Sequence, residues 1–471
     1  MQVLKKFSLI LFCFAVANCS SPISLRGGIE DNSLSIEEMT LDSRKVFRVG
    51  VLLPLTGQAA KQGQGMKNAA ILALDDVKNP NLVLQFYDTK STPAGSRIAI
   101  ENAFNQRADL ILGPLMSSSL QAISEQAERK RVPVIAFSTS EELLKPGIYT
   151  MGLLIDEQIN RVITYAAQNG RKTFALLLPD NSTGIAVAKA AVRSAEKNNV
   201  AISRIGFYPP NTSDFSEILK QMTDYYVRSK KAQEIKVGLQ RAAAAGDENA
   251  KRQLKKYGSF ATSGGVEYDA VLIPESGAKL KSAMAMFGYY DIYEPKVKFL
   301  GTSVWEGTAL NKETVAIGSW YPALSRVYSK YFAQKFVDTF SEKPSPLYSL
   351  AYDAVALSNA LAMKQNSNIY DNITNSDGYI GINGVFRIYE NGSNEHSLDI
   401  YEVRERGDVV VDSAPKKLSE HEMRDIGSYV RVVDGYVAPK FYGKDEYTAQ
   451  ALIYGKVLPK VQEIEIESVD F

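Results

Sequence analysis

Two hydroxyl-rich loops carry the side chains best suited to holding a small polar molecule. Ser117 and Ser118 follow the segment GPLM at the start of a predicted helix, and Ser138 and Thr139 follow the apolar run VPVIAF. Hydroxyls and free backbone N–H groups at a helix start suit a carboxylate. Serine and threonine are also preferred helix caps where no ligand binds, so capping alone is the competing interpretation.

Further candidates stand in loops later in the chain. Thr183 lies in the sequence DNSTG, Glu275 follows YDAVLIP, and Trp305 lies in TSVWEG. Glu275 could meet an ammonium group, or it is an ordinary exposed loop carboxylate. Trp305 and Trp320 are predicted near the mouth of a cleft, where an indole could stack on a ligand or fill a cleft that binds none.

The sequence lacks the common catalytic patterns. The glycines at positions 57, 63 and 65 do not form GxGxxG, no GK[ST] follows them, and no GxSxG surrounds the serines. The only histidines, His396 and His421, lie in polar, turn-like segments with no second histidine or cysteine at metal-ligand spacing. We therefore expect a non-enzymatic protein with no catalytic residue, no cofactor and no metal site.

The candidate loops need strands and helices that bring them together. The run VGVLLPLTG, residues 49–57, is followed by glycines and then by apolar or small residues at helical spacing from Met66 to Val77. Because this strand is apolar on both faces, it belongs in a parallel sheet covered by helices on both sides. Further strands are predicted at residues 82–87, 110–112, 133–137, 173–179, 200–207, 268–274 and 297–301. Their alternation with helical patterns predicts right-handed βαβ units in two α/β lobes.

Later segments are less regular. Residues 228–256 are rich in Lys, Arg, Ala, Gln and Glu, which predicts a surface helix or helical hairpin, either a partner-binding arm or a solvated insertion. Helices are predicted at residues 324–340 and 350–363, a strand with an Asn-Gly turn at 384–393 and a hairpin at 399–411. The EIEIE run at 463–467 either pairs on a sheet edge or stays mobile.

The N-terminus has the features of an export signal. Lys5 and Lys6 precede an apolar run of about ten residues, whereas a bilayer-spanning helix needs roughly twenty. Residues 16–19, Val-Ala-Asn-Cys, resemble a bacterial lipobox, in which Cys19 becomes lipid-modified after cleavage; the alternative is a secretory signal with a chance cysteine. Residues 1–18 are thus a predicted lipoprotein signal peptide and residues 19–45 a flexible tether. Cys13 and Cys19 are the only cysteines, so cleavage leaves no disulfide pair.

Length and charge set wider limits. The chain has 471 residues, 45% of them hydrophobic, which is enough for two or three domains with their own cores. Its formal net charge is +1 at pH 7. Because there is no overall basic field, nucleic-acid binding is not expected.

Five segments, in order, resemble the leucine-binding-protein-like family of type I periplasmic binding proteins. They are VGVLLPLTGQAAKQGQGMKNAAILALDD, LILGPLMSSS, VPVIAFSTS, YDAVLIPESG and AYDAVALSNAL, and the resemblance covers residues 47–412. Within that family, GYYDI from Gly288 and FLGTSVWEG from Phe299 look most like the penicillin-binding protein activator branch, which are lipoproteins that regulate peptidoglycan synthases.

The resemblance implies an α/β fold with two doubly wound parallel-sheet lobes joined by three crossovers, the type I periplasmic binding fold. Lobe one would comprise residues 46–155 and 303–363, lobe two residues 156–302 and 364–412, and residues 413–471 a C-terminal extension. Ser117, Ser118, Ser138 and Thr139 would meet the carboxylate and ammonium of an amino acid in the cleft. Where amino-acid binders of the family have tyrosine before glycine, this chain has Thr183, which cannot cover a ligand as a ring would.

Two functional hypotheses follow. The first, which we favour, is a non-catalytic lipoprotein, anchored by its lipid and facing the periplasm from the inner or outer membrane, that binds and activates a peptidoglycan synthase. The second is a lipid-anchored receptor that delivers an amino acid or similar small polar solute to the permease of an ABC importer. The hypotheses share fold and location, and they differ in whether a ligand occupies the cleft.

Overall fold

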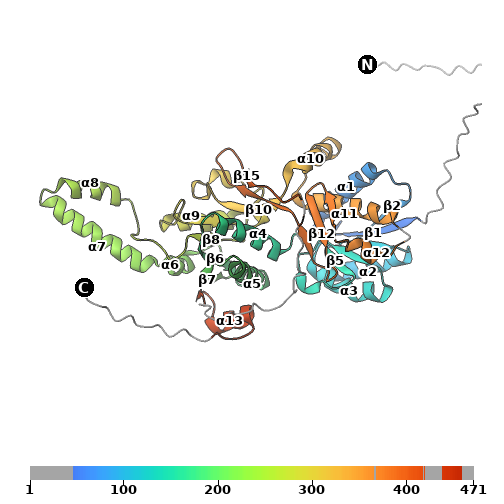
Figure 1. The fold of residues 1–471 in the computed structure, drawn as a ribbon, viewed down its shortest axis with the longest axis horizontal. Helices are drawn as coiled ribbons and strands as arrows, with labels where there is room; N and C mark the ends of the chain where they lie inside the picture. Colours follow the sequence, from blue (N-terminus) through green and yellow to red (C-terminus); the bar gives the residue numbers. More distant parts are fainter. Residues whose placement is uncertain (1–45, 365–366, 417, 419–437, 459–471) are drawn as a thin grey trace, which may run out of the picture. The chain divides into compact units, whose positions relative to one another are not determined.

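The computed structural model describes residues 46–364, 367–416, 418 and 438–458 (Figure 1). The predicted signal peptide, Cys19, the predicted tether, His421 and the EIEIE run lie outside the described residues. The described residues form two large sheets and one small one.

The first large sheet has five parallel strands in the order β2-β1-β3-β4-β5. Its strands are β1 (Phe47–Leu53), β2 (Leu82–Asp88), β3 (Leu110–Leu112), β4 (Val134–Ala136) and β5 (Ile148–Thr150). This is the doubly wound order 2-1-3-4-5, which reverses direction between β1 and β3. Loops that follow β1, β3 and β4 therefore leave the sheet at the same edge.

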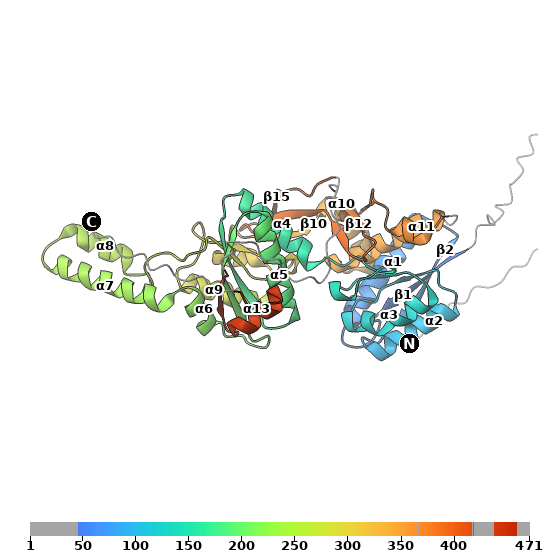
Figure 2. The same ribbon diagram turned by 60° about the horizontal axis from the view of Figure 1, so that its bottom comes forward.

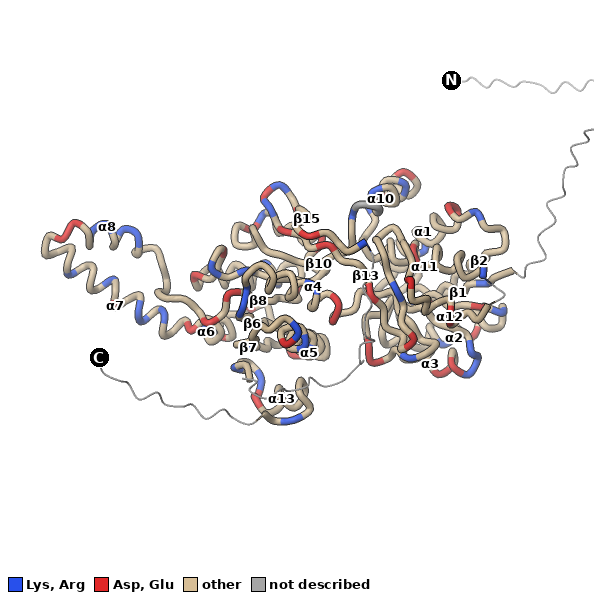
Figure 3. The backbone as a smooth tube through the Cα atoms, in the orientation of Figure 1, with Lys and Arg blue, Asp and Glu red and all other residues tan. Residues whose placement is uncertain are grey.

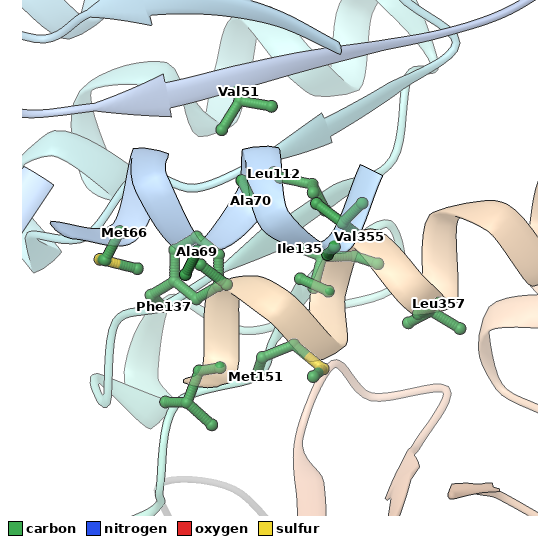
Figure 4. Packing of buried hydrophobic residues seen from close by; sticks show 14 of the residues in the cluster. Val51, Met66, Ala69, Ala70, Leu112, Ile135, Phe137, Met151, Val355 and Leu357 are labelled. Carbon is green, nitrogen blue, oxygen red and sulfur yellow. The ribbon is translucent and has the colours of Figure 1, made fainter. Parts of the chain in front are cut away.

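Helices cover both faces of this sheet. Val49 and Val51 of β1 face a core shared with α1 (Ala60–Val77), α10 (Arg326–Phe340) and α11 (Pro346–Met363). Figure 4 shows part of this core, where Met66, Ala69 and Ala70 of α1 lie between the strands and α11. Leu52 faces the opposite core, with α2 (Pro93–Asn105) and α3 (Ser117–Lys130). Burial on both faces explains why β1 has no polar side chain from Val49 to Leu53.

The second large sheet has eight strands in the order β15-β14-β10-β9-β8-β6-β7-β16. Its strands are β6 (Thr173–Pro179), β7 (Ala201–Tyr208), β8 (Ala270–Leu272), β9 (Lys298–Leu300), β10 (Trp320–Leu324), β14 (Leu398–Glu402), β15 (Val409–Asp412) and β16 (Lys440–Tyr442). The six neighbouring strands β10, β9, β8, β6, β7 and β16 are parallel to one another. β14 and β15 add an antiparallel pair beside β10. Strands β7-β6-β8-β9-β10 repeat the order of the first sheet, so its direction reverses between β6 and β8.

The second sheet is also covered on both faces. One face packs against α4 (Ile155–Gln168), α5 (Ser182–Lys197) and α13 (Glu446–Tyr454). The other packs against α6 (Ser216–Met222), α9 (Gly277–Tyr289) and the short 3-10 segments η2 (Ser303–Trp305), η3 (Leu310–Lys312) and η4 (Thr314–Ala316). Figure 2 shows α13 beside α5 from a second direction. The predicted α/β architecture is confirmed, with one parallel sheet and one that is parallel except for β14 and β15.

The remaining elements are small. A three-stranded antiparallel sheet contains β11 (Tyr379–Gly381), β12 (Gly384–Ile388) and β13 (Asn394–His396). Two short helical segments are η1 (Glu141–Leu143) and α12 (Ile369–Ile373). The helices α7 (Tyr225–Ala244) and α8 (Glu248–Tyr257) pack against each other as a hairpin.

Over the described residues, the chain crosses three times from one large sheet and its helices to the other. Two of these crossings lie at other residues than the predicted lobe boundaries. Residues 303–324, predicted with the first lobe, end in β10, which pairs with β9 and β14 of the second sheet. Residues 369–396, predicted with the second lobe, place Ile373, Phe386 and Ile388 in the core of the first sheet. These crossings therefore lie near residues 325 and 397, and the remaining one lies before α4.

Candidate functional site

The two serine loops predicted to act together do meet. The Oγ atoms of Ser117 and Ser138 are 2.9 Å apart, and the Ser140 hydroxyl donates to the Ser117 Oγ at 2.5 Å. The backbone N–H of Ser140 donates to the Ser138 Oγ at 3.2 Å. Because β3 and β4 are adjacent and parallel, the loops that follow them share one sheet edge, which accounts for this hydroxyl cluster.

Helix capping does not explain the first serine loop. The cap position of α3 is Met116, which makes no side-chain capping bond, and Ser117 is already the first helical residue. Ser138 is 2% exposed, and its carbonyl accepts a hydrogen bond from the Thr150 hydroxyl at 2.6 Å. Ser118 and Thr139 are exposed. The cluster thus combines a buried hydroxyl with neighbours that reach solvent.

Thr183 lies in the first turn of α5, where the chain leaves β6. The side chain of Asn181 caps this helix by accepting from the Gly184 N–H at 3.0 Å. A Cβ at Gly184 would collide with the carbonyl oxygen of Pro179, and one at Gly63 would collide with that of Pro54. Glycine is therefore required where a helix start approaches the end of the first strand in both sheets.

A cavity of about 550 Å³ joins these loops. Its lining brings together two predicted residues, Thr139 and Thr183, and adds side chains from η1, α4, α5 and α13 with their loops. The further lining residues are Ser140, Glu141, Glu142, Ile155, Asp156, Asp180, Asn181, Ser182, Ile185, Ala186, Lys189, Arg193, Lys444 and Leu452. We refer to it below as the α5 pocket. Its mixed charges and hydroxyls suit a small polar molecule better than an apolar one.

Charged groups in the α5 pocket pair with one another. The Lys444 Nζ lies 2.5 Å from an Asp180 carboxylate oxygen, and Arg193 lies 2.5 Å from Asp156. Burial lowers the pKa of Lys189, and the charge of Arg193 acts in the same direction. Ion pairs within the chain thus neutralise much of the charge of the pocket.

Glu275 is held by another side chain. Its carboxylate accepts a hydrogen bond from the Tyr208 hydroxyl at 2.8 Å. Burial raises the pKa of Tyr208, and this hydrogen bond raises it further, so the phenol stays protonated and donates. Glu275 follows β8 at the edge where the predicted ligand loops lie, but Tyr208 already bonds to it.

Both tryptophans are core residues, which corrects their predicted place at a cleft mouth. Trp305 is 1% exposed, and its indole N–H donates to the Ile273 carbonyl at 3.0 Å. Trp320 is 7% exposed, and its N–H donates to Glu402 at 3.0 Å. Trp305 follows β9 as expected, but its ring turns into the core between the second sheet and its helices, so neither face is open to a ligand.

Two residues of the α5 pocket, Lys444 and Leu452, were not predicted from the sequence. They come from the C-terminal extension, where nothing in the sequence pattern indicates a pocket. His396, predicted in a polar turn, lies in β13 and is 6% exposed beside Glu157, which accepts its backbone N–H. Within the described residues, no three His, Cys, Asp or Glu side chains are grouped as a metal site. The helices described here include none long and apolar enough to cross a membrane.

Comparison with known sequences gives one family and several distant relatives. A family model described as periplasmic binding protein matches residues 46–408. An uncharacterized Rickettsia prowazekii protein is 22% identical over 189 residues, which are 40% of this chain and 50% of the relative. The penicillin-binding protein activator LpoA of Vibrio cholerae is 24% identical over 176 residues, which are 36% of this chain and 29% of that protein. The matches span half or less of each relative's length.

Comparison with solved structures identifies the same fold. An ABC transporter substrate-binding protein from Sphaerobacter thermophilus is 16% identical, with a TM-score of 0.59 over 79% of this chain and 98% of that chain. A leucine-binding protein, LivK, from Thermotoga maritima is 16% identical, with a TM-score of 0.52 over 78% of this chain and 99% of that chain. At such identities the similarity applies to the fold alone.

Proposed function

Because the chain belongs to the periplasmic binding protein family, whose model matches residues 46–408, we propose that it binds and activates a peptidoglycan synthase outside the cytoplasm. It does so as a non-catalytic lipoprotein, exported by residues 1–18 and anchored through Cys19. The proposed partner is a penicillin-binding protein, in keeping with the name given to the Vibrio cholerae relative.

The ion pairing of the α5 pocket carries this proposal. A receptor for transport releases and rebinds its solute, so its polar groups must be available to that solute. In this chain Lys444 pairs with Asp180, and Arg193 pairs with Asp156. A charged ligand would have to compete with these bonds. Such a pocket suits a protein that acts through its outer surface.

Trp305 supports the same conclusion. Aromatic side chains are useful at ligand sites when a ring face is open. Here the ring is buried and its N–H is bonded to Ile273, so it stabilises the second sheet and its helices. The Gly301 backbone packs directly against this ring, since a Cβ at that position would collide with it.

Reconstitution tests the proposed function. The chain from residue 20 onward is mixed with purified synthase from the same cells, and glycan polymerisation and peptide crosslinking are timed with and without it. We expect direct binding and a faster rate of at least one reaction. The heat-unfolded chain is the control for non-specific effects. Absence of both binding and stimulation would contradict the proposal.

An alternative function has its own supporting observation. The hydroxyl cluster of Ser117, Ser138 and Ser140 lies beside the α5 pocket and includes a buried hydroxyl. This arrangement would suit the carboxylate of an amino acid or similar small polar solute, which the chain would deliver to an ABC importer.

A bound solute would distinguish the alternative. Native mass spectrometry of the chain from residue 20 onward would reveal a small molecule carried through purification. Replacing Ser138 and Thr139 by alanine should then weaken the binding of that ligand by about 1 to 3 kcal/mol, because the charged groups of the ligand lose hydrogen bonds. Unchanged affinity would mean that this loop does not contact the ligand. If the purified protein carries no small molecule, the result favours synthase activation over transport.

A further inference from the structure

Within the part of the chain that the structure describes, the hairpin of α7 and α8 packs on the rest of the protein only near its base. The buried residues of α7 are Arg228 and Ala232, both in its first half, and the buried residue of α8 is Ala250. From Gln233 to Asn249, every residue is exposed or half-buried. Because so little of the hairpin packs on the body, its length is not explained by stabilisation of the fold.

The hairpin carries a concentrated positive charge. Residues 225–257 contain nine Lys or Arg and three Asp or Glu, an excess of six positive charges, whereas the whole chain has a net charge of +1. Figure 3 shows basic residues along both helices. The surface of the hairpin is therefore electrostatically unlike the rest of the molecule.

Among the residues that the structure describes, few acidic groups pair with this positive charge. Lys251 pairs with Glu248, and Lys236 donates to the Phe260 carbonyl at 2.8 Å. Among the described residues, no acidic group pairs with six exposed basic residues of the hairpin. These are Lys230, Lys231, Arg241, Arg252, Lys255 and Lys256. An acidic partner could meet them without first breaking bonds within the chain.

A row of tyrosines lies at the base of the hairpin. The rings of Tyr226 and Tyr225 are 5.8 Å apart, those of Tyr225 and Tyr290 are 4.8 Å apart, and those of Tyr290 and Tyr289 are 5.4 Å apart. The two ends are exposed, Tyr226 by 58% and Tyr289 by 67%, and Val227 beside them is 72% exposed. Exposed tyrosines of this kind are enriched in protein–protein interfaces.

The base of the hairpin is held in place. The Arg228 guanidinium donates to the carbonyls of Thr223 and Tyr290, both at 3.1 Å, and to the Gly264 carbonyl at 3.2 Å. Lys236 fixes the segment that follows α8 through the Phe260 carbonyl. An interface that is rigid before binding loses less conformational entropy when the partner docks.

The distribution of side chains favours a protein over a membrane as the occupant. A helix that lies in a membrane surface presents large apolar residues along one face. The large exposed apolar residues of this hairpin are Tyr226, Val227 and Tyr257, and its outer turn leads into Asp247 and Glu248. Acidic residues at the turn would oppose contact with anionic lipid, whereas basic sides next to tyrosines fit an acidic protein face.

We propose that the α7–α8 hairpin and the tyrosines at its base dock an acidic face of the protein partner. The inference rests on the proposed function, since the partner used to test it is the extracytoplasmic domain of the peptidoglycan synthase. The hairpin residues Arg252, Lys255 and Lys256 supply charge, and Tyr226 and Tyr289 supply the apolar contact.

Charge reversal tests the proposal. The variant R252E/K255E/K256E changes three exposed side chains of α8, and K61E/R97E/K130E makes the same change on α1, α2 and α3 as a matched control. Dissociation constants for the synthase domain are measured at about 0.1 M and about 1 M salt, where screening lengths are about 10 Å and 3 Å. We expect the hairpin variant to bind at least about tenfold more weakly at low salt, with a smaller salt dependence than the wild type. The control should stay within about twofold, and Tyr289→Ala should weaken binding at both salt concentrations.

Each other outcome overturns a defined part of the proposal. If the wild type binds the synthase and the hairpin variant binds equally well, the docking surface is wrong and the proposed function stands. If the wild type does not bind the synthase at all, both are wrong. The wild type could instead bind phosphatidylglycerol vesicles and not the synthase, while the hairpin variant binds neither. The hairpin would then be a membrane-binding surface, and the proposed protein partner would be wrong. Circular dichroism spectra of the variants check that the helices remain, and the salt dependence of the wild type tests the charge contribution without any substitution.

Discussion

Asp353 is a buried acid that joins α11 to the small antiparallel sheet. Asp353 is only 3% exposed. Its carboxylate accepts hydrogen bonds from the Ile382 N–H at 2.8 Å and from the Asn383 side-chain amide at 2.9 Å. Burial raises the pKa of Asp353 to about 6, although these hydrogen bonds oppose the rise. The acid therefore ties two elements together at the cost of an unfavourable charge near neutral pH.

The pKa of Asp353 predicts a pH dependence of stability. In the unfolded chain the pKa is near 3.8, so between about pH 4 and pH 6 the folded state keeps a proton that the unfolded state has lost. The contribution of this group is therefore fully present below about pH 4 and is lost as the pH rises through about 6, by at most about 3 kcal/mol. Urea unfolding from pH 4 to pH 7 measures it.

Two variants separate this contribution from that of other groups. Asp353→Asn should remove this part of the slope, whatever its effect on stability at any single pH. Asp377→Asn, at an exposed position just before β11, should keep the wild-type slope. Equal slopes for the wild type and Asp353→Asn would show that another group titrates in this range.

Trp305 makes a second residue-scale prediction. Replacing it by alanine should lower the free energy of unfolding by about 3 to 5 kcal/mol, because a buried ring leaves a cavity. Phenylalanine should cost less, since it fills much of the space. It leaves a smaller cavity than alanine and also loses the hydrogen bond to Ile273, which contributes about 0.5 to 1.5 kcal/mol. Urea unfolding at fixed pH gives both values. A nearly neutral Trp305→Ala would mean that the ring is not part of the core.

At the scale of elements, the sequence predicted strands that are apolar on both faces and missed those that depend on tertiary pairing. β1 has no polar side chain from Val49 to Leu53, and β6 has none from Phe174 to Pro179, so these runs are enough to identify the two strands. β16 reads Lys-Phe-Tyr, and it is a strand because it pairs with β7 and because α13 packs nearby. β10 contains Pro322, which disfavours a strand prediction, yet it lies between β9 and β14.

The α13 helix should stabilise the second sheet through one face. Ile453 is fully buried in the core shared with α5, whereas its neighbour Leu452 is 39% exposed. We expect Ile453→Ala to lower the free energy of unfolding by about 2 to 5 kcal/mol. Leu452→Ala is the matched control and should change it by no more than about 0.5 kcal/mol. Equal effects in urea unfolding would mean that α13 does not dock as described.

At the scale of the whole molecule, the family resemblance is confirmed, and chain topology explains which site residues could be predicted. Loops at the carboxyl ends of neighbouring parallel strands meet, so the proximity of Ser117 and Ser138 agrees with their predicted positions in loops that follow two strands. The position of Lys444 in the α5 pocket could not be predicted, because this residue lies in a segment beyond the family match. The direction of a side chain after a strand, as for Trp305, likewise depends on packing that the sequence pattern does not contain.

The last prediction concerns how the molecule is held at a membrane. If Cys19 carries a diacylglyceryl group and an amide-linked chain, each buried methylene contributes about 0.8 kcal/mol, which makes two or more chains a stable anchor. Cys19→Ser should then leave the protein in the soluble fraction after cell breakage. Cys13→Ser changes the only other cysteine, inside the predicted signal, and should leave the protein in the membrane pellet. Immunoblots of both fractions, with and without a high-salt wash, measure the distribution. If Cys19→Ser still sediments with membranes after that wash, the lipid at Cys19 is not the anchor, and the hairpin or another surface must hold the protein there.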